Sequence, residues 1–124
     1  VRLAQRINAV ENYWGEIQLL DDDPSKLGLS LLGVEIVGPF SRLSESDPER
    51  TEVANLVARK TLARSAARQK IQAHGLPCCS LISPDVDISG AVLESAVTVY
   101  HHATIGPEVF VGEGSVVFMG AVIG

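Results

Sequence analysis

Aliphatic residues recur at intervals of six along the last third of the chain. One interval, from Ile88 to Leu93, is a residue shorter than the others. The leading residues of the units are Ile82, Ile88, Leu93, Val99, Ile105, Val111, Val117 and Ile123. The fifth positions of the units are small or β-branched, namely Val86, Val92, Val97, Ala103, Val109, Ser115 and Ala121. Strands of an open sheet would alternate at period two, whereas a six-residue repeat predicts a parallel β-helix.

The geometry of a triangular coil explains the repeat. Each unit supplies one flat face, and three units complete a turn. The leading side chain points inward and stacks on its equivalents in adjacent coils, about 4.8 Å away along the axis. We expect the second inward position of each unit, the fifth, to stay small because the interior is narrow.

The first 80 residues follow other periods. Leu3, Ile7, Val10 and Trp14 have helical spacing and predict a helix over residues 2–13, ended by Gly15. A second helix is expected over residues 61–75, with Thr61 as its N-cap and Gly75 as its end.

Short aliphatic runs predict strands between these helices, over residues 16–20, 34–38 and 52–58. The polar stretch 41–50 is expected to be a surface loop. Helices alternating with short strands indicate an α/β unit with a small, largely parallel sheet. We therefore expect two domains, an α/β domain over residues 1–80 and a β-helix over residues 81–124.

Composition narrows the possible partners. The net charge of −5 argues against a nucleic-acid surface, which needs a basic excess. No apolar stretch reaches the roughly 18 residues of a membrane span, so the expected compartment is the cytoplasm. The two cysteines, Cys78 and Cys79, are adjacent and lack metal-site or redox spacing, which predicts a packing role.

Four stretches in order resemble the left-handed β-helix sugar O- and N-acyltransferases, and most closely the sialic-acid O-acetyltransferases and the nucleotide-amino-sugar acetyltransferases. They are "LLDDDPSKLG", "LLGVEIVGP", "GLPCCSLISPDVDIS" and "VGEGSVVFMGAVIG". The resemblance implies a left-handed β-helix, a nucleotide-sugar-binding N-terminal domain, acetyl-CoA as co-substrate and a homotrimer. It also implies truncation at both ends, since the family's first strand and Gly-rich turn would precede residue 1.

Acyl transfer from a thioester to a sugar requires a base near the acceptor, and histidine supplies one at neutral pH. His101 and His102 are expected to face outward at a coil corner. The resembled family carries its catalytic histidine in a segment D-H-D-x-x-I-G. Matching Ile105 and Gly106 to its end puts His101 on that histidine, with His102 as the second candidate. The alternative match, which treats "VGEGSVVFMGAVIG" as an early coil, places the base beyond Gly124.

Substrate-binding residues are expected at the end of the second strand of the family's sheet, where Asp21, Asp22 and Asp23 could accept hydrogen bonds from a nucleotide. A solvated turn explains the same residues equally well. Gly112, Gly114 and Gly120 are candidate contacts for acetyl-CoA along the coils. No metal site is expected, because His74 lies in the other half and leaves only an adjacent histidine pair.

Two functions are favoured at this point over a third, a nucleotidyltransferase with a β-helix tail, which would require a large upstream domain. The first is a CoA-dependent sugar O- or N-acetyltransferase with a histidine base. The alternative is a non-catalytic trimeric β-helix scaffold or nucleotide-sugar-binding module.

Overall fold

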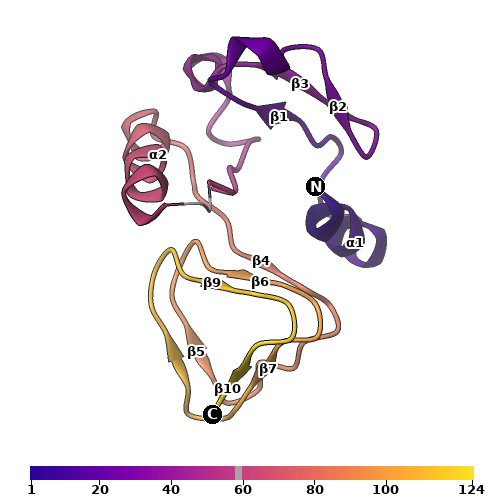
Figure 1. The fold of residues 1–124 in the computed structure, drawn as a ribbon, viewed down its shortest axis with the longest axis vertical. Helices are drawn as coiled ribbons and strands as arrows, with labels where there is room; N and C mark the ends of the chain where they lie inside the picture. Colours follow the sequence, from indigo (N-terminus) through magenta and orange to yellow (C-terminus); the bar gives the residue numbers. More distant parts are fainter. Residues whose placement is uncertain (58–59) are drawn as a thin grey trace. The chain divides into compact units, whose positions relative to one another are not determined.

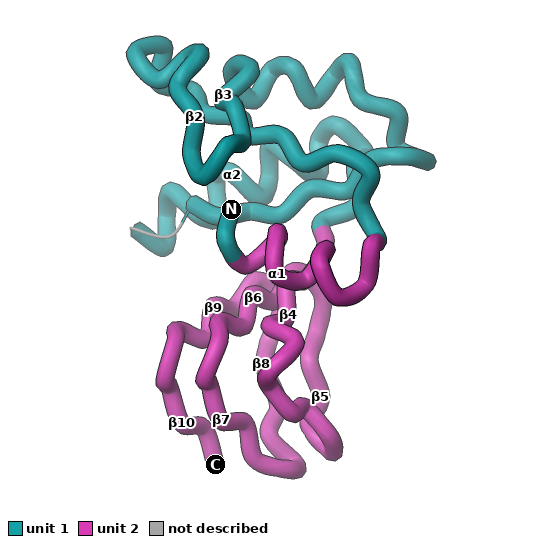
Figure 2. The backbone as a smooth tube through the Cα atoms, turned by 90° about the vertical axis from the view of Figure 1, so that its right-hand side faces the viewer, with its two compact units in different colours: residues 1–2, 13–78 teal, residues 3–12, 79–124 magenta. Residues whose placement is uncertain are grey.

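The computed structural model describes residues 1–57 and 60–124, which form two compact units. The first unit comprises residues 1–2 and 13–78, and the second comprises residues 3–12 and 79–124 (Figure 2). The units divide close to the expected boundary at residue 80, but the first helix groups with the second unit. The assignment of residues 1–80 and 81–124 as domains stays a prediction.

The sheet of the first unit is mixed. Its strands are β1 (Leu19–Leu20), β2 (Ser30–Leu31) and β3 (Val34–Gly38), in the order β1-β3-β2. β1 pairs with β3 in parallel and β2 pairs with β3 antiparallel, so the expectation of a largely parallel sheet is wrong. The reason is a tight hairpin: Leu32 and Gly33 both have positive φ, 49° and 80°, as a two-residue turn between β2 and β3 requires.

The strand expected over residues 52–58 does not form among the described residues 52–57, and Ala58 lies outside the described residues. Val53 makes only an isolated parallel bridge to Cys78. Nearby, the buried side chain of Asn55 donates to the carbonyl of Arg64 at 2.9 Å and accepts from the Val57 N–H at 3.1 Å. Such local side-chain bonds compete with a strand ladder, which explains the irregular backbone.

The helical segments of the first unit are α2 (Thr61–Ala73) and two 3₁₀ turns, η1 (Pro24–Lys26) and η2 (Phe40–Glu45). Thr61 is the first helical residue of α2 rather than its cap, because Lys60 occupies the N-cap without a side-chain bond. Gly75 follows the helix with a φ of 69°, as expected of a C-terminal glycine. The turn η2 replaces the expected loop because it carries Leu43 into a small core with Ile71 and Leu76.

The second unit is a parallel β-helix, as the six-residue repeat predicted. Its strands form three parallel ladders on the three sides of a triangular coil (Figure 1). One ladder joins β4 (Leu81–Ile82), β6 (Thr98–Val99) and β9 (Val116–Val117). The others join β5 (Val92–Leu93) to β8 (Phe110–Val111), and β7 (Thr104–Ile105) to β10 (Val122–Ile123).

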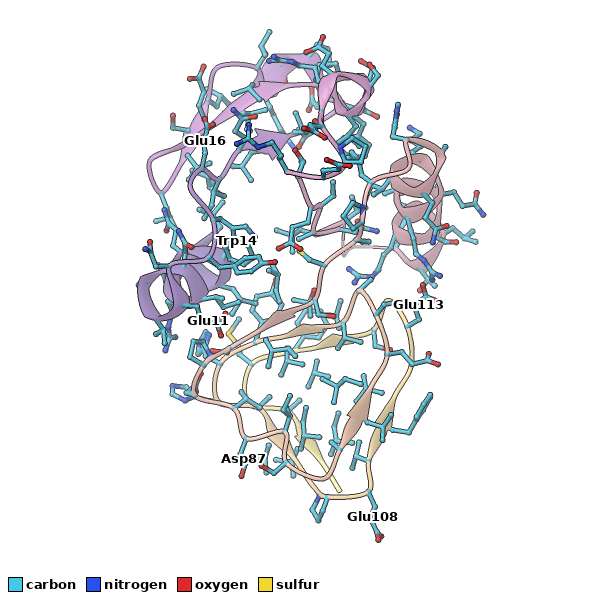
Figure 3. The ribbon with its side chains drawn as sticks, turned by 180° about the vertical axis from the view of Figure 1, so that it is seen from behind. Glu11, Trp14, Glu16, Asp87, Glu108 and Glu113 are labelled. Carbon is cyan, nitrogen blue, oxygen red and sulfur yellow. The ribbon has the colours of Figure 1, made fainter. Side chains whose placement is uncertain are left out.

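Side chains fill the inside of these coils, as Figure 3 shows. Every leading aliphatic residue belongs to or packs against one hydrophobic cluster, and Val97 and Val99 are fully buried. The prediction that the fifth residue of each unit faces inward is wrong for Val92, which is 58% exposed. Ala91 packs inward instead. The unit from Ile88 to Leu93 has only five residues, so its inward position moves back by one.

The first helix, α1 (Arg2–Glu11), buries Leu3 and Ile7 within the second unit. It ends earlier than expected because Asn12, not Gly15, adopts the left-handed conformation, with a φ of 49°. The Asn12 N–H donates to the carbonyl of Asn8 at 2.8 Å, which closes the helix. Within the described ranges, no helix is both long enough and apolar enough to cross a bilayer.

Candidate functional site

The corners of the β-helix are two-residue turns, and their backbone geometry repeats. The second residue of most turns has a positive φ, a conformation that glycine adopts easily. These residues are Gly90, Ala96, His102, Glu108, Gly114 and Gly120. Because Ala96 and Glu108 share the conformation of His102, the positive φ marks a coil corner and is not by itself a sign of function.

One corner brings polar side chains from successive coils into a column. Ile82, Val99 and Val117 pair in register, so the third residue after each of them occupies the same place in its own coil. Those residues are Asp85, His102 and Gly120. The residues just before them are Pro84, His101 and Met119. The two expected histidines therefore lie at one corner, between an aspartate on one side and a glycine on the other.

Asp85 is the centre of the polar contacts at this corner. One of its carboxylate oxygens, Oδ2, accepts from the backbone N–H of His102 at 2.9 Å and lies 3.1 Å from Nδ1 of the same residue. Its other oxygen accepts from the hydroxyl of Ser83, which is fully buried. The side chain of His102 is 77% exposed, so most of its ring is open to solvent.

These hydrogen bonds keep Asp85 ionised. The hydroxyl of Ser83, followed by the backbone N–H of His102, lowers the pKa of Asp85 from 3.8 to about 2. A carboxylate whose pKa is lower in the folded protein stabilises the fold above its unfolded pKa. That contribution is lost as the pH falls through the folded value.

We therefore expect an acid-sensitive difference between the native protein and an Asp85→Asn variant. The native protein should exceed the variant in free energy of unfolding above about pH 4, and the excess should shrink as the pH falls toward about 2. Urea unfolding at several pH values measures it. A difference that stays constant from pH 5 to pH 2 would contradict the assigned role of the carboxylate.

His101 is less exposed than His102 and contacts it. The two imidazole rings meet edge to face with their centroids 5.1 Å apart. Beside them, Tyr100 stacks on Phe118 of the next coil, at 6.2 Å and nearly parallel. The corner thus combines two imidazoles, a carboxylate and an aromatic wall, which could abstract a proton and pack against an organic ligand.

The three expected substrate-binding aspartates lie in the first unit and have different surroundings. Asp21 pairs with Lys26 at 3.0 Å, and Asp23 caps η1 by accepting from Ser25. Hydrogen bonds within the turn lower the pKa of both carboxyls. Asp21 and Asp23 therefore serve the local turn.

Asp22 is the member of this group that lines a pocket. The pocket measures about 310 Å³ and is lined by Asp22, Phe40, Ser41, Lys70, Ala73 and His74. The carboxylate of Asp22 accepts from the Phe40 N–H at 2.8 Å and from Nζ of Lys70 at 3.3 Å. The same ammonium lies 5.7 Å from the centre of the Phe40 ring. A charged pair beside an aromatic face suits a ligand with both polar and planar parts.

The three glycines expected to contact acetyl-CoA lie along the coils. Gly114 and Gly120 are corner residues, each with a φ of 73°. Gly112 follows β8, and a Cβ there would meet Glu94 at 3.8 Å. Their conformations follow from the corners, and their contact with a cofactor stays a prediction.

A metal site would need several ligating side chains close together. No group of three or more histidine, cysteine, aspartate or glutamate residues among them is placed to hold an ion. Cys78 and Cys79 are both half-buried.

Three residues at the corner carry signals that the sequence reading missed. Asp85 and Ser83 precede His102 by roughly one coil, so the repeat itself could have placed them beside it. The third is Met119. The segment D-H-D-x-x-I-G also fits the end at Ile123 and Gly124, and this register puts Met119 in the place of the histidine. Ile105 pairs with Ile123, so His101 and Met119 are equivalent residues of successive coils.

Comparisons with known proteins agree with this fold. No protein-family model and no curated protein matches the chain. Among solved structures, the acetyltransferase domain of PglB from Neisseria gonorrhoeae FA1090, in complex with acetyl coenzyme A, is 25% identical, with a TM-score of 0.82 over 98% of this chain and 57% of that one. PerB from Caulobacter crescentus, in complex with CoA and GDP-perosamine, is 22% identical, with a TM-score of 0.74 over 98% and 57%.

A variant of the second protein extends the comparison. A histidine-to-asparagine mutant of perosamine N-acetyltransferase from Caulobacter crescentus, in complex with CoA and GDP-perosamine, has a TM-score of 0.75 at 22% identity, over 98% of this chain and 58% of that one. The chain thus spans less than two thirds of these structures. The resemblance predicted from the sequence is confirmed in three dimensions: the chain is similar to the hexapeptide-repeat β-helix sugar acetyltransferases.

Proposed function

We propose that the protein transfers an acetyl group from acetyl-CoA to an amine or hydroxyl of a nucleotide-linked sugar. The observation that carries this proposal is the close match of the whole described fold to an acetyltransferase domain that holds acetyl coenzyme A. Both the α/β unit and the β-helix take part in the match, since it covers 98% of the chain. The GDP-perosamine in the second relative supports a nucleotide-linked sugar as the acceptor.

His102 is the proposed general base, with His101 beside it. Nε2 of His102 takes the proton of the acceptor while the acceptor nitrogen or oxygen attacks the thioester carbonyl. The carbon–sulfur bond then breaks, and CoA leaves as its thiol after a proton is returned to the sulfur. Direct attack needs no covalent intermediate on the protein.

The nucleotide part of the acceptor is proposed to bind the pocket at Asp22. The ring of Phe40 offers a stacking surface for a base, and the ammonium of Lys70 offers a positive charge for a phosphate. Backbone groups along the coils, among them those of Gly112, Gly114 and Gly120, would hold acetyl-CoA. No metal is assigned to the reaction.

Assembly as a homotrimer of left-handed β-helices is part of the proposal. Its support is a small set of exposed apolar residues on the outside of the coils. Val92 and Phe110 are paired neighbours on one side, 58% and 63% exposed, and Val122 on another side is 77% exposed. Isolated outward aliphatic residues are ordinary, but an adjacent valine and phenylalanine suit a subunit contact. A cytoplasmic location stays a prediction.

Thiol release from acetyl-CoA tests the function. We expect release that depends on an acceptor when the protein is mixed with nucleotide-linked amino-sugars and sialic acid, and none above background without one. An Asp22→Ala variant should raise KM for the acceptor more than it lowers kcat, because Asp22 is assigned to binding. Glu49→Ala, an exposed change in the same unit, is the control. Release that ignores the acceptor would contradict the proposal.

A non-catalytic binding module is the second candidate, and Met119 is the observation that favours it. If the register ending at Ile123 is the functional one, the base has been replaced by a thioether that cannot accept a proton at neutral pH. A Met119→His variant separates the candidates. If the native protein transfers no acetyl group and the Met119→His variant does, the native fold binds its ligands and lacks only the base.

A further inference from the structure

The ring of His102 is held at one end and open at the other. Its Nδ1 faces Oδ2 of Asp85 at 3.1 Å, and its own backbone N–H donates to the same oxygen at 2.9 Å. The two contacts come from one residue to one carboxylate oxygen, so they fix both the backbone and the ring. The side chain as a whole is 77% exposed, so most of the ring is open to solvent.

This contact decides which ring nitrogen carries the proton in neutral His102. A carboxylate only accepts hydrogen bonds, so Nδ1 must be the protonated nitrogen. Nε2 is then unprotonated and can accept a proton from a ligand. An aspartate that fixes the tautomer of a histidine base is a known device of hydrolytic triads, and it acts without becoming protonated itself.

Asp85 is itself held in place from the other side. Ser83, which is fully buried, donates its hydroxyl to the second carboxylate oxygen. Together with the His102 N–H, this bond accounts for the low pKa of Asp85. Among the described residues, the titratable side chains of Asp85 and His101 contact His102, and the centroids of the two imidazole rings lie 5.1 Å apart.

The next coil leaves room beside His102. Gly120 follows it in the column, and a Cβ built on Gly120 would meet no atom within 4 Å. This corner of the next coil therefore carries no side chain, and the space around Gly120 is open.

Turn stabilisation alone would explain part of these contacts. Asp87 makes such a contact two residues later, where its carboxylate accepts from the Ser89 N–H at 2.8 Å. Asp85 differs from Asp87 because it reaches an adjacent coil and contacts an imidazole nitrogen. Asp87 is therefore a matched control, with the same side chain and the same kind of local bond.

We propose that Asp85 is a positioning residue that holds His102 as its Nδ1–H tautomer, with Nε2 unprotonated and facing outward to receive the proton of the acceptor. The statement about the reaction rests on the proposed function. The statement about the ring does not, and it can be measured without turnover.

The test combines nitrogen NMR with kinetics on Asp85→Ala and Asp87→Ala. In protein labelled with ¹⁵N-histidine at alkaline pH, native protein and Asp87→Ala should show Nδ1–H for His102. Asp85→Ala should move it toward Nε2–H, the form that free imidazole side chains favour in water. In acetyl transfer, Asp85→Ala should lower kcat about 10-fold or more with little change in KM for acetyl-CoA.

Each outcome decides one part of the proposal. If the tautomer of His102 is unchanged in Asp85→Ala, Asp85 does not position the ring. If the tautomer changes but Asp85→Ala is as active as Asp87→Ala, Asp85 is not important for catalysis. If the native protein transfers no acetyl group, the proposed function fails. The NMR measurement of the His102 tautomer then tests the positioning role of Asp85 by itself. Should Asp85→Ala not fold, Asp85→Leu, which has a similar size but no acceptor oxygen, replaces it in the same comparison.

Discussion

Exchange of His102 for alanine is expected to lower kcat of acetyl transfer by about 100-fold or more, because general-base catalysis contributes roughly that much. The variant should keep its fold, since the side chain is largely exposed and its loss leaves no cavity. The measurement is acceptor-dependent thiol release at saturating acetyl-CoA. KM for acetyl-CoA should change little, because the base acts on the acceptor.

His101→Ala is the matched control, because the two imidazoles are adjacent and their rings touch. We expect it to lower kcat less than 10-fold. The reverse order of effects would make His101 the base, as the match of D-H-D-x-x-I-G to Ile105 and Gly106 predicts. If both variants keep native activity, neither histidine is the base.

Exchange of Ile105 for aspartate is expected to unfold the β-helix. Ile105 is 7% exposed, leads a six-residue unit and pairs with Ile123 of the next coil. An unpaired carboxylate inside the coil costs several kcal/mol, which is comparable to the whole stability of a small domain. Loss of the β-sheet signal in circular dichroism and of the cooperative urea transition measures the effect.

Thr104→Asp controls for the chemical change. Thr104 is the neighbouring residue of the same strand β7, and its side chain is exposed because successive residues of a strand face opposite sides. Its replacement should change the free energy of unfolding by about 1 kcal/mol or less. Equal destabilisation by the two variants would contradict the inward and outward assignments within the repeat.

The β-helix could be predicted from the sequence because its information is local and repeated. Every coil needs an inward-facing aliphatic side chain at its leading position. The spacing of Val99, Ile105 and Val111 therefore predicts the fold without knowledge of distant contacts. The exception was Val92, where the short unit shifted the inward position to Ala91. A register counted backward from the next leading residue would have avoided that error.

The α/β unit was harder to predict because its decisive contacts are individual. The hairpin at Leu32 and Gly33 made the sheet mixed, and two hydrogen bonds of Asn55 replaced a strand. Each depends on one side chain or one turn, and a hydrophobic pattern does not record such bonds. Short strands of two residues also leave too little pattern to recognise.

The candidate site was predicted in part. The sequence led to the corner with His101 and His102, but it did not associate Asp85 with His102, because partners one coil apart are separated by 17 residues. The column of Asp85, His102 and Gly120 depends on the register between coils. The three aspartates of residues 21–23 could also be distinguished only in the structure, where Asp22 is the one of the three that lines the pocket.

The central claim is acetyl transfer to a nucleotide-linked sugar, and following the acetyl carbon itself tests it most directly. Acetyl-CoA labelled with carbon-13 in the acetyl group would be incubated with the protein and each acceptor, and the sugar product examined by mass spectrometry and NMR. The account predicts label on an amine or hydroxyl of one nucleotide-linked sugar, with transfer strongly reduced by His102→Ala. A folded protein that leaves every acceptor unlabelled, or that releases the label as free acetate, would contradict it.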